Sequence, residues 1–292
     1  MLNRKSGKIT TNREGSNSPV LPEQNMKEDK KIIVTGANGK MGRETVKTIH
    51  SEPGMKLVGA VGRKDMIGED IISLLGLEGP PLEITSNLEE AIERTEADTL
   101  IEFSVPGAAM KNITIALERG LHVIVGTTGL KEEEIKQLEK LTAEVPGNLI
   151  LAPNFSLGAN LMLKFASLAA SYFKRAEIIE MHQDKKEDAP SGTALKTAQL
   201  LAPICKGKKE KRNSQPARGE DYQGISIHSV RLPGMVAHQE VIFGEEGQVL
   251  TLRHDTYDRS SFMPGLLLAL DKINEIDNMV YGLENLISLS EE

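Results

Sequence analysis

Hydrophobic and polar positions along residues 31–154 alternate between short apolar runs and longer segments with helical spacing. The short runs predict buried strands at residues 31–35, 57–61, 100–103, 122–125 and 149–152. Apolar positions that recur with a helical period predict helices at residues 41–49, 108–118 and 132–143. Such alternation is typical of βαβ units, whose parallel sheet is covered by helices on both faces. We therefore expect an α/β fold with a Rossmann-type, doubly wound parallel sheet at residues 30–154.

The pattern changes after about residue 155. A helix, a strand and a second helix are expected first, at residues 158–173, 177–181 and 191–201. Strands with little helix between them follow, at residues 225–232, 236–243 and 249–253. Gly-containing turns join these strands, which favours an antiparallel or mixed sheet. We expect a second, α+β domain at residues 155–259, and a last helix within residues 260–292 that completes the first domain.

Residues 1–29 are polar and show no hydrophobic periodicity, so we interpret them as a disordered N-terminal tail. Met26 lies just before the first expected strand and is a candidate for the biological start. A transit peptide is the alternative interpretation. The acidic residues Glu14, Glu23, Glu28 and Asp29 argue against it, because transit peptides contain few acidic side chains.

Composition excludes several classes of protein. The 292 residues carry a formal net charge of −7, whereas nucleic-acid binding needs clustered positive charge, and we interpret the basic run at residues 206–212 as a solvated loop. No apolar run reaches the roughly 18 residues that span a bilayer. Cys205 is the only cysteine, so neither an internal disulfide nor a cysteine-based metal site is expected, and a reducing cytoplasm fits.

A glycine-rich loop follows the first expected strand and opens the first expected helix. Residues 36–42 read Gly-Ala-Asn-Gly-Lys-Met-Gly, a variant of the dinucleotide-binding fingerprint. In that fingerprint the first Gly makes a tight turn, the second lets the backbone approach the pyrophosphate, and the third allows close packing of helix and strand. Strand, loop, helix and second strand occur in the expected order, so we predict a dinucleotide site in preference to a merely structural turn.

The tip of the second expected strand lacks the acidic residue that usually binds the ribose 2′-hydroxyl group. Gly62, Arg63 and Lys64 stand there instead, and a guanidinium group can pair with a 2′-phosphate. We therefore expect NADPH as the preferred cofactor, with an ordinary exposed loop as the alternative for these residues. Loops at residues 126–129 and 152–155 follow later strands, so they are expected to line the same crevice or to be structural turns.

One segment combines a candidate acid, a candidate cation and a candidate anion cradle. His182 and Lys186 follow the strand expected at residues 177–181, and residues 190–193 read as a helix start. Helix starts bind carboxylates through free backbone N–H groups and the positive end of the helix dipole. A small dicarboxylate substrate would need these groups. Asp188 either orients Lys186 or caps the helix, and we favour the structural role.

Residues 31–271 resemble the 4-hydroxy-tetrahydrodipicolinate reductase (dihydrodipicolinate reductase) family of bacterial lysine and diaminopimelate synthesis. Residues 177–194 match every fixed position of the family signature E-[IV]-x-E-x-H-x-x-x-K-x-D-x-P-S-G-T-A. Further shared motifs occur at residues 34–42, 102–106, 126–129, 154–156 and 229–234. The resemblance implies a cytoplasmic homotetramer, tetramerised through the sheet of its substrate domain. It also implies NAD(P)H-dependent reduction of 4-hydroxy-tetrahydrodipicolinate to tetrahydrodipicolinate with loss of water.

The resemblance also implies roles for residues of both expected domains. His182 resembles the catalytic acid or base, and Lys186 the second catalytic residue, a proton donor or cation. The positions that match substrate-binding residues, of which the last two hold a carboxylate, are Gln183, Ser191, Gly192 and Thr193. The positions that match cofactor-binding segments, in a family that often accepts NADH as well as NADPH, are Gly36, Ala37, Asn38, Gly39, Lys40, Met41, Arg63, Gly126, Thr127, Thr128, Ala152, Pro153, Asn154 and Phe155. Arg259 and Phe262 match a C-terminal Arg-x-x-Phe near the site.

Gln183 is a departure, because many members of the family have a second His there. A Gln amide can donate a hydrogen bond but carries no charge. The remaining histidines are interpreted as structural, and no pair of them shows zinc-ligand spacing with a carboxylate, so no metal is expected: His50, His122, His228, His238 and His254. Two alternatives stay open, another two-domain Rossmann reductase of a small acid such as an aspartate dehydrogenase, and a non-enzymatic nucleotide-sensing regulator. The intact His182 and Lys186 argue against the second.

Overall fold

The first sheet of the computed structural model, which describes residues 29–205 and 216–289, has seven strands in the order β12-β6-β5-β4-β1-β2-β3. They are β1 (Lys30–Thr35), β2 (Met55–Val61), β3 (Ile84–Thr85), β4 (Thr99–Glu102), β5 (His122–Val125), β6 (Leu149–Leu151) and β12 (Met279–Tyr281). Every pairing in this sheet is parallel. The strand order reverses between β1 and β4, the place where open parallel sheets bind ligands.

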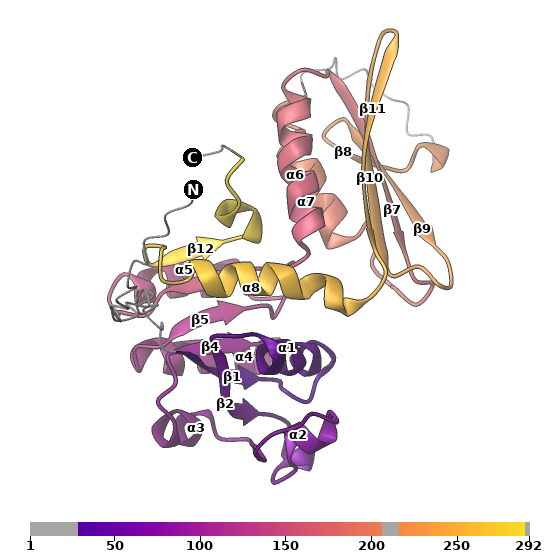
Figure 1. Cartoon of the computed structure of the whole chain (residues 1–292). Helices are drawn as coiled ribbons and strands as arrows, with labels where there is room; N and C mark the ends of the chain where they lie inside the picture. Colours follow the sequence, from indigo (N-terminus) through magenta and orange to yellow (C-terminus); the bar gives the residue numbers. More distant parts are fainter. Residues whose placement is uncertain (1–28, 206–215, 290–292) are drawn as a thin grey trace, which may run out of the picture.

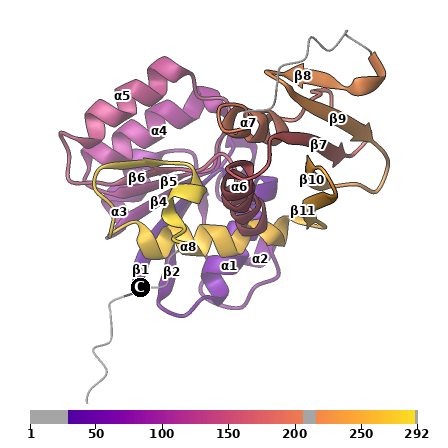
Figure 2. The same cartoon turned by 90° about the horizontal axis from the view of Figure 1, so that it is seen from above.

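Helices cover both faces of this sheet (Figure 2), as a parallel sheet requires. One face is covered by α1 (Lys40–Ser51), α2 (Ile71–Leu74) and α8 (Met263–Lys272), and the other by α3 (Leu88–Arg94), α4 (Pro106–Glu118) and α5 (Glu132–Thr142). Side chains of a strand point alternately to the two faces. Ile32 and Val34 accordingly belong to the core under α1 and α8, whereas Ile33 belongs to the core under α4.

The second domain is a five-stranded mixed sheet in the order β11-β10-β7-β9-β8 (Figure 1). Its strands are β7 (Arg175–His182), β8 (Glu220–Tyr222), β9 (Ile225–Arg231), β10 (Ala237–Glu245) and β11 (Gln248–Thr256). Only β7 and β9 pair in parallel, and the other pairs are antiparallel. Two helices, α6 (Leu157–Ala170) and α7 (Gly192–Leu201), cover one face and bury Ile178, Val241 and Phe243.

The α/β fold with a Rossmann-type parallel sheet and a second mixed sheet is therefore confirmed, whereas several short elements were not predicted. Those missed are β3, α2, α3, β8, β12 and the 3₁₀ turns η1 (Lys64–Met66), η2 (Pro216–Arg218), η3 (Arg259–Phe262) and η4 (Leu283–Leu286). Segments this short are stabilised by tertiary contacts more than by their own sequence. The segment expected as one returning helix thus holds α8 and also the edge strand β12, which pairs with β6.

Two sequence predictions lie outside the described residues: the disordered tail up to residue 28, and the basic loop at residues 206–212. Within the described parts of the chain, no helix is long and apolar enough to cross a membrane.

Candidate active site

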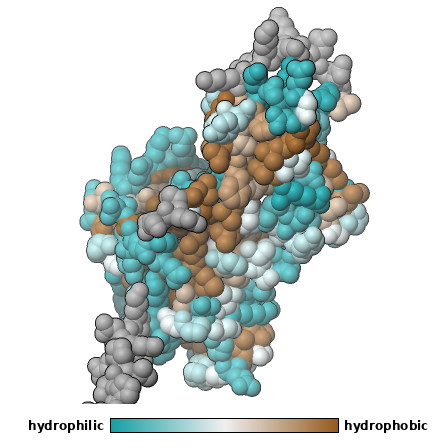
Figure 3. All heavy atoms as spheres, turned by 45° about the horizontal axis from the view of Figure 1, so that its top comes forward, coloured by the Kyte–Doolittle hydropathy of each residue, from teal (hydrophilic) through white to brown (hydrophobic). Residues whose placement is uncertain are grey.

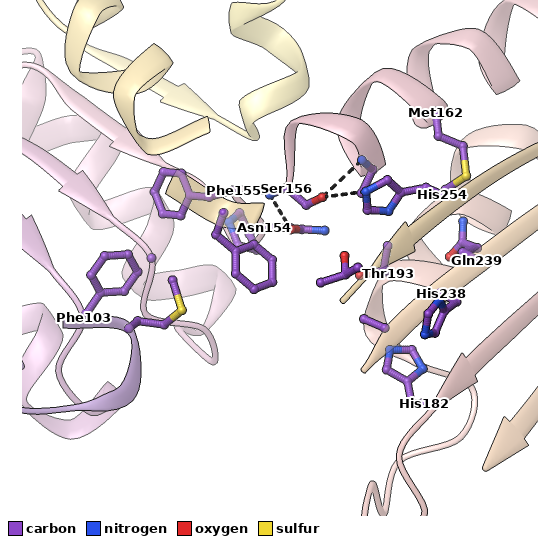
Figure 4. A pocket seen from close by; sticks show the side chains of 17 residues that line it. Phe103, Asn154, Phe155, Ser156, Met162, His182, Thr193, His238, Gln239 and His254 are labelled. Atoms are coloured by element: carbon purple, nitrogen blue, oxygen red, sulfur yellow. Dashed lines mark hydrogen bonds between the residues drawn. The ribbon is translucent and has the colours of Figure 1, made fainter. Parts of the chain in front are cut away.

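A cavity of about 350 Å³ lies between the two domains (Figure 4). The first domain contributes Met41, Phe103, Gly126 and the β6–α6 loop at residues 153–156. The second contributes side chains from β7, β10, β11 and the start of α7, namely His182, Thr193, Ala237, His238, Gln239, His254 and Thr256. Phe262 closes the cavity from the turn before α8. Binding sites are commonly found at such domain interfaces.

The glycine loop at the end of β1 is built so closely that larger residues do not fit. Gly36 has a φ of +65°, and a Cβ atom there would lie 2.4 Å from the carbonyl oxygen of Phe103. A Cβ atom at Gly42 would lie 2.1 Å from the carbonyl oxygen of Gly36. The loop therefore packs directly against the end of β4 and brings the start of α1 to the crevice.

The start of α1 suits a pyrophosphate group. Its N-cap, Gly39, provides no side-chain cap, and the first turn contains no acidic residue. The N–H groups of that turn have no acceptor within the helix, so they and the helix dipole can bind an anion. Of the neighbouring predicted residues, Met41 lines the cavity, Ala37 is buried in the core, and Lys40 is exposed.

The ribose end of the predicted cofactor site lies at the tip of β2. The amide nitrogen of Asn38 is buried there and has no hydrogen-bond partner among the described residues. This unused hydrogen-bond donor lies close to Gly62: a Cβ atom added to Gly62 would lie 3.0 Å from the Asn38 Oδ1 atom. Arg63 follows, largely exposed, with its guanidinium group 3.4 Å from Asp65. These groups fit the ribose end of a dinucleotide, whose hydroxyl or phosphate oxygens can accept from Asn38 and Arg63.

A buried carboxylate holds together the loops at the ends of β4 and β5. Glu102, at the end of β4, has no exposed surface. It accepts hydrogen bonds from Thr35 Oγ1 at 2.7 Å, Asn112 Nδ2 at 2.8 Å, the Ser104 N–H group at 2.5 Å and Thr127 Oγ1 at 3.3 Å. It therefore connects β1, α4 and the loop after β5. Sequence reasoning assigned Glu102 no role, although it starts one of the shared motifs.

The loops after β5 and β6 lie where sequence reasoning expected them. Gly126, Pro153, Asn154 and Phe155 line the cavity. Thr127 and Ala152 are buried behind that wall, and Thr128 is exposed. The rings of Phe103 and Phe155 pack edge to face with centroids 5.8 Å apart. Aromatic side chains in this place give the cavity an apolar floor on the side of the first domain.

His182 ends β7 and lines the cavity from the second domain. Its Nδ1 atom is hydrogen-bonded to the carboxylate of Glu180 at 2.5 Å. Burial lowers the pKa of His182 from its ordinary value of 6.5, and the positive charges of Lys186 and Arg231 add to this effect, while Glu180 opposes it. The carboxylate of Glu180 thus partly offsets the effect of burial on the pKa of His182.

Glu180 is fully buried and is hydrogen-bonded to side chains and main chain of several segments. Arg231 binds it with both terminal nitrogens, each 2.8 Å from a carboxylate oxygen. The N–H group of Ser191 donates to it at 3.2 Å. Burial alone would raise the pKa of Glu180, but hydrogen bonds from Arg231, Ser229 and His182 outweigh burial and lower it. Glu180 is therefore an anion in the folded protein.

The remaining predicted substrate residues lie around the start of α7. Thr193 lines the cavity, whereas Lys186, Gln183 and Gly192 lie outside its lining. Lys186 Nζ contacts both carboxylate oxygens of Asp188, at 2.7 and 2.8 Å. Asp188 thus pairs with Lys186 in place of the favoured structural role. The N-cap of α7 is Ser191, whose hydroxyl accepts from the N–H group of Ala194 at 3.2 Å.

Two histidines that the sequence indicated as structural also line the cavity, His238 and His254. His238 Nδ1 is bonded to Asp255 at 2.6 Å, and His254 Nε2 to Ser156 Oγ at 3.2 Å. Burial lowers the pKa of His254. Their sequence neighbourhood contained no motif, and they reach the site because β10 pairs with β7 and β11 pairs with β10. Of the C-terminal pair, Phe262 lines the cavity, and Arg259 lies in a neighbouring pocket with Lys40 and Arg43.

A metal site is not among the features of this region: the described residues contain no group of three or more His, Cys, Asp or Glu side chains that could hold a metal ion. The glycine loop at the switch point of a parallel sheet, and a second domain that presents a histidine across the cavity, define a two-domain pyridine-nucleotide-dependent oxidoreductase.

Comparisons with known proteins identify the family of oxidoreductases to which the chain belongs. Residues 30–155 match the family "Dihydrodipicolinate reductase, N-terminus", and residues 158–287 match "Dihydrodipicolinate reductase, C-terminus". The chain therefore belongs to the dihydrodipicolinate reductase family. It reduces 4-hydroxy-tetrahydrodipicolinate with a pyridine nucleotide, a step of lysine synthesis through diaminopimelate.

Individual relatives cover almost the whole chain. The 4-hydroxy-tetrahydrodipicolinate reductase of Moorella thermoacetica is 48% identical over 88% of this chain and 97% of its own length. That of Syntrophomonas wolfei is 46% identical over 90% of this chain and 100% of its own. A dipicolinate-bound dihydrodipicolinate reductase from Paenisporosarcina sp. TG-14 superposes with a TM-score of 0.78, at 42% identity, covering 89% of this chain and 100% of its own. An aspartate dehydrogenase or a non-enzymatic regulator is therefore not favoured.

Proposed function

We propose that His182 is the acid of the reduction and that it donates its proton from Nε2. The observation that carries this is the bond between Nδ1 and Glu180, because it leaves Nε2 as the ring nitrogen free to serve the cavity. The substrate hydroxyl group leaves as water together with a hydrogen from a neighbouring ring carbon. A bound pyridine nucleotide would then supply a hydride to the resulting double bond, and His182 would supply the proton. Burial lowers the pKa of His182, and a weaker hold on the proton makes its release easier once the ring is protonated.

Lys186 and the start of α7 are proposed to hold the two carboxylates of the substrate. The relative from Paenisporosarcina sp. TG-14 was solved with dipicolinate, a dicarboxylate. In the present chain α7 has no acidic residue in its first turn, so the N–H groups of Gly192 and Thr193 can donate hydrogen bonds to an anion. Lys186 would exchange Asp188 for a substrate carboxylate. Gln183 would add a neutral hydrogen-bond donor beside it.

The cofactor is proposed to lie along the glycine loop, with NADPH preferred and NADH also accepted. Gly36, Gly39 and the start of α1 would hold the pyrophosphate, and Asn38 and Arg63 the ribose end. The loops at residues 126–128 and 152–155 would hold the nicotinamide end. The preference rests on the absence of a carboxylate at the tip of β2, which would repel a 2′-phosphate.

We further propose that residues 30–154 with the C-terminal segment form the cofactor domain, and that residues 155–259 bind the substrate and build a cytoplasmic homotetramer. Strand β11 lies at the edge of the second sheet, and its first four residues are exposed. Val249 and Leu250 are apolar residues on that edge. Figure 3 shows apolar residues gathered on the second domain and toward the first. An open apolar edge strand is the kind of surface that a second copy would cover.

The activity is tested by following NADPH absorbance with freshly generated product of dihydrodipicolinate synthase. The expected result is rapid oxidation of NADPH with this substrate, and none with oxaloacetate and ammonium ions. Oxidation only with oxaloacetate and ammonium would indicate an aspartate dehydrogenase. Binding of NADPH with no turnover of either substrate would indicate a regulator.

A further inference from the structure

A row of polar side chains crosses the second sheet directly beneath the proposed acid. Glu180 on β7 pairs with Ser229 on β9 and with Gln239 on β10. Of these, Glu180 is the charged member and is fully buried. An unpaired buried carboxylate would be costly, yet this one is an anion with a cation and several donors around it. Because burying this charge costs free energy, its place next to the proposed acid indicates that Glu180 positions His182.

Arg231 joins this carboxylate to the segment that carries Lys186. Besides its two bonds to Glu180, its Nη2 atom donates to the carbonyl oxygen of Asp188 at 2.7 Å. The side chain of Asp188 in turn contacts Lys186. One guanidinium group thus fixes both the partner of His182 and the main chain two residues beyond Lys186. Arg suits this place because its planar fork binds a carboxylate with two parallel hydrogen bonds.

We propose that Glu180 and Arg231 are positioning residues that hold both His182 and the Lys186 segment in the arrangement that the reaction needs. Glu180 accepts the Nδ1–H proton, so that the proton for the substrate is carried on Nε2. Arg231 fixes the direction of that carboxylate and ties the loop of residues 183–190 to the same point. The proposal rests on the proposed role of His182 and adds how its tautomer and orientation are set.

The charges that face His182 come from several elements. Glu180 lies on its own strand, Lys186 and Asp188 on the loop that follows, and Arg231 on β9. On the other side, β10 and β11 contribute the His238–Asp255 pair, with Arg253 bound to Asp255. Among these groups, Glu180 raises the pKa of His182, whereas Lys186 and Arg231 lower it. Removing the charge of Glu180 should therefore lower the pKa of His182 further.

The chain contains a matched control on the opposite face of the same strand. Glu177 also binds a histidine and an arginine: His228 Nε2 lies 2.9 Å from its carboxylate, and Arg218 contacts the other oxygen. This second cluster lies outside the cavity lining. Glu177→Gln thus makes the same chemical change in the same strand without touching the proposed positioning pair.

The first test compares Glu180→Gln with Glu177→Gln in steady-state kinetics across pH. Glu180→Gln should lower kcat by about 10²-fold or more, the scale seen when the carboxylate partner of a catalytic histidine is neutralised. Because a proton donor must be protonated, the basic limb of the pH profile should move to lower pH. The KM for NADPH should stay the same, and Glu177→Gln should behave as wild type. An unshifted profile and an unchanged kcat in Glu180→Gln would overturn the proposal.

The second test needs no substitution that could prevent folding. In the wild-type protein, ¹⁵N NMR of His182 above its pKa should show the neutral ring with its proton on Nδ1. A proton on Nε2 would overturn the proposal.

A third test uses Arg231→Lys, which keeps the positive charge but loses the planar fork. This variant should raise the KM for substrate about tenfold, and an unchanged KM would count against the proposed tie between Arg231 and the Lys186 loop. If His182→Gln kept full turnover, the role of His182 itself would fail, which is a different outcome.

Discussion

The two domains contribute different kinds of chemical groups to the two walls of the cavity. The first domain contributes a glycine loop, a helix start without a capping side chain, and mainly apolar side chains that follow β4 and β6. The second domain forms its wall from side chains of three strands and the start of α7, with Arg231 of a fourth strand bound behind them. Main-chain N–H groups can bind a pyrophosphate in any sequence that permits the turn. Proton transfer needs particular side chains whose pKa values are set by their neighbours. The cofactor wall should therefore be sensitive to added bulk, and the substrate wall to lost charge.

The largest expected effect comes from removing the acid in the substrate wall. His182→Gln should lower kcat by about 10²- to 10⁴-fold, the usual contribution of a positioned acid. Steady-state kinetics with the synthase product provide the measurement, and the melting temperature provides the control for folding. Near-wild-type turnover in this variant, or in Lys186→Ala, would show that the proton and the positive charge come from elsewhere.

Bulk added to the cofactor wall should act on binding. A Cβ atom at Gly42 would lie 2.1 Å from the Gly36 carbonyl oxygen, so Gly42→Ala must displace the loop and should raise the KM for NADPH about tenfold or more, consistent with the usual cost of overpacking. Gly107→Ala is the matched control, because nothing lies within 4 Å of a Cβ atom there. Equal KM values for the two variants would mean that the glycine loop does not hold the cofactor.

The exposed tip of β2 should have a smaller, selective effect. Arg63→Ala should raise the KM for NADPH by about tenfold at low salt and leave NADH nearly unchanged, because a charge-assisted hydrogen bond to the 2′-phosphate is lost. Gly62→Glu is less suitable as a second variant for this test, because a Cβ atom at Gly62 would lie 2.7 Å from the Ile84 side chain and would disturb the packing. The measurement is kcat/KM for both cofactors at one salt concentration. A silent Arg63→Ala would remove the basis for the NADPH preference.

Stability should fall on acidification, and part of the loss should come from the substrate wall. Burial lowers the pKa of His182 and His254 from 6.5, and hydrogen bonds lower the pKa of Glu180 from 4.5 despite its burial. In each case the unfolded chain binds more protons, so stability rises with pH. The histidine contribution should be lost below about pH 6.5 and the Glu180 contribution as pH falls below about 4.5. The melting temperature should therefore fall in both ranges, and a rise between pH 7 and pH 5 would contradict these assignments.

The smallest effect is expected from the N-terminal tail. A protein that starts at Met26 should keep its turnover and its oligomeric state, because the family match begins only at residue 30. Size-exclusion chromatography with light scattering, together with the reductase assay, compares the two forms. Loss of the oligomer on truncation would assign the tail to an interface.

Local sequence patterns predicted the cofactor wall better than the substrate wall. The G-x-x-G-x-x-G spacing and the strand–helix alternation are short-range features, and both elements occur where they were expected. The bond from Arg231 to Glu180 spans 51 residues, and His238 reaches the cavity only because β10 pairs with β7. Such contacts depend on strand order, which periodicity does not specify. The family signature contained Glu180 as a fixed position, but only its burial and its partners indicate what it does.

The separation of the two walls is tested most directly by the NADPH dissociation constant of His182→Gln, determined by calorimetric titration alongside its kcat. If the first domain binds the cofactor and the second supplies the proton, the variant should bind NADPH as tightly as wild type while its turnover falls about 10²-fold or more. A dissociation constant that weakens by as large a factor as turnover would contradict the account, because it would place His182 in cofactor binding.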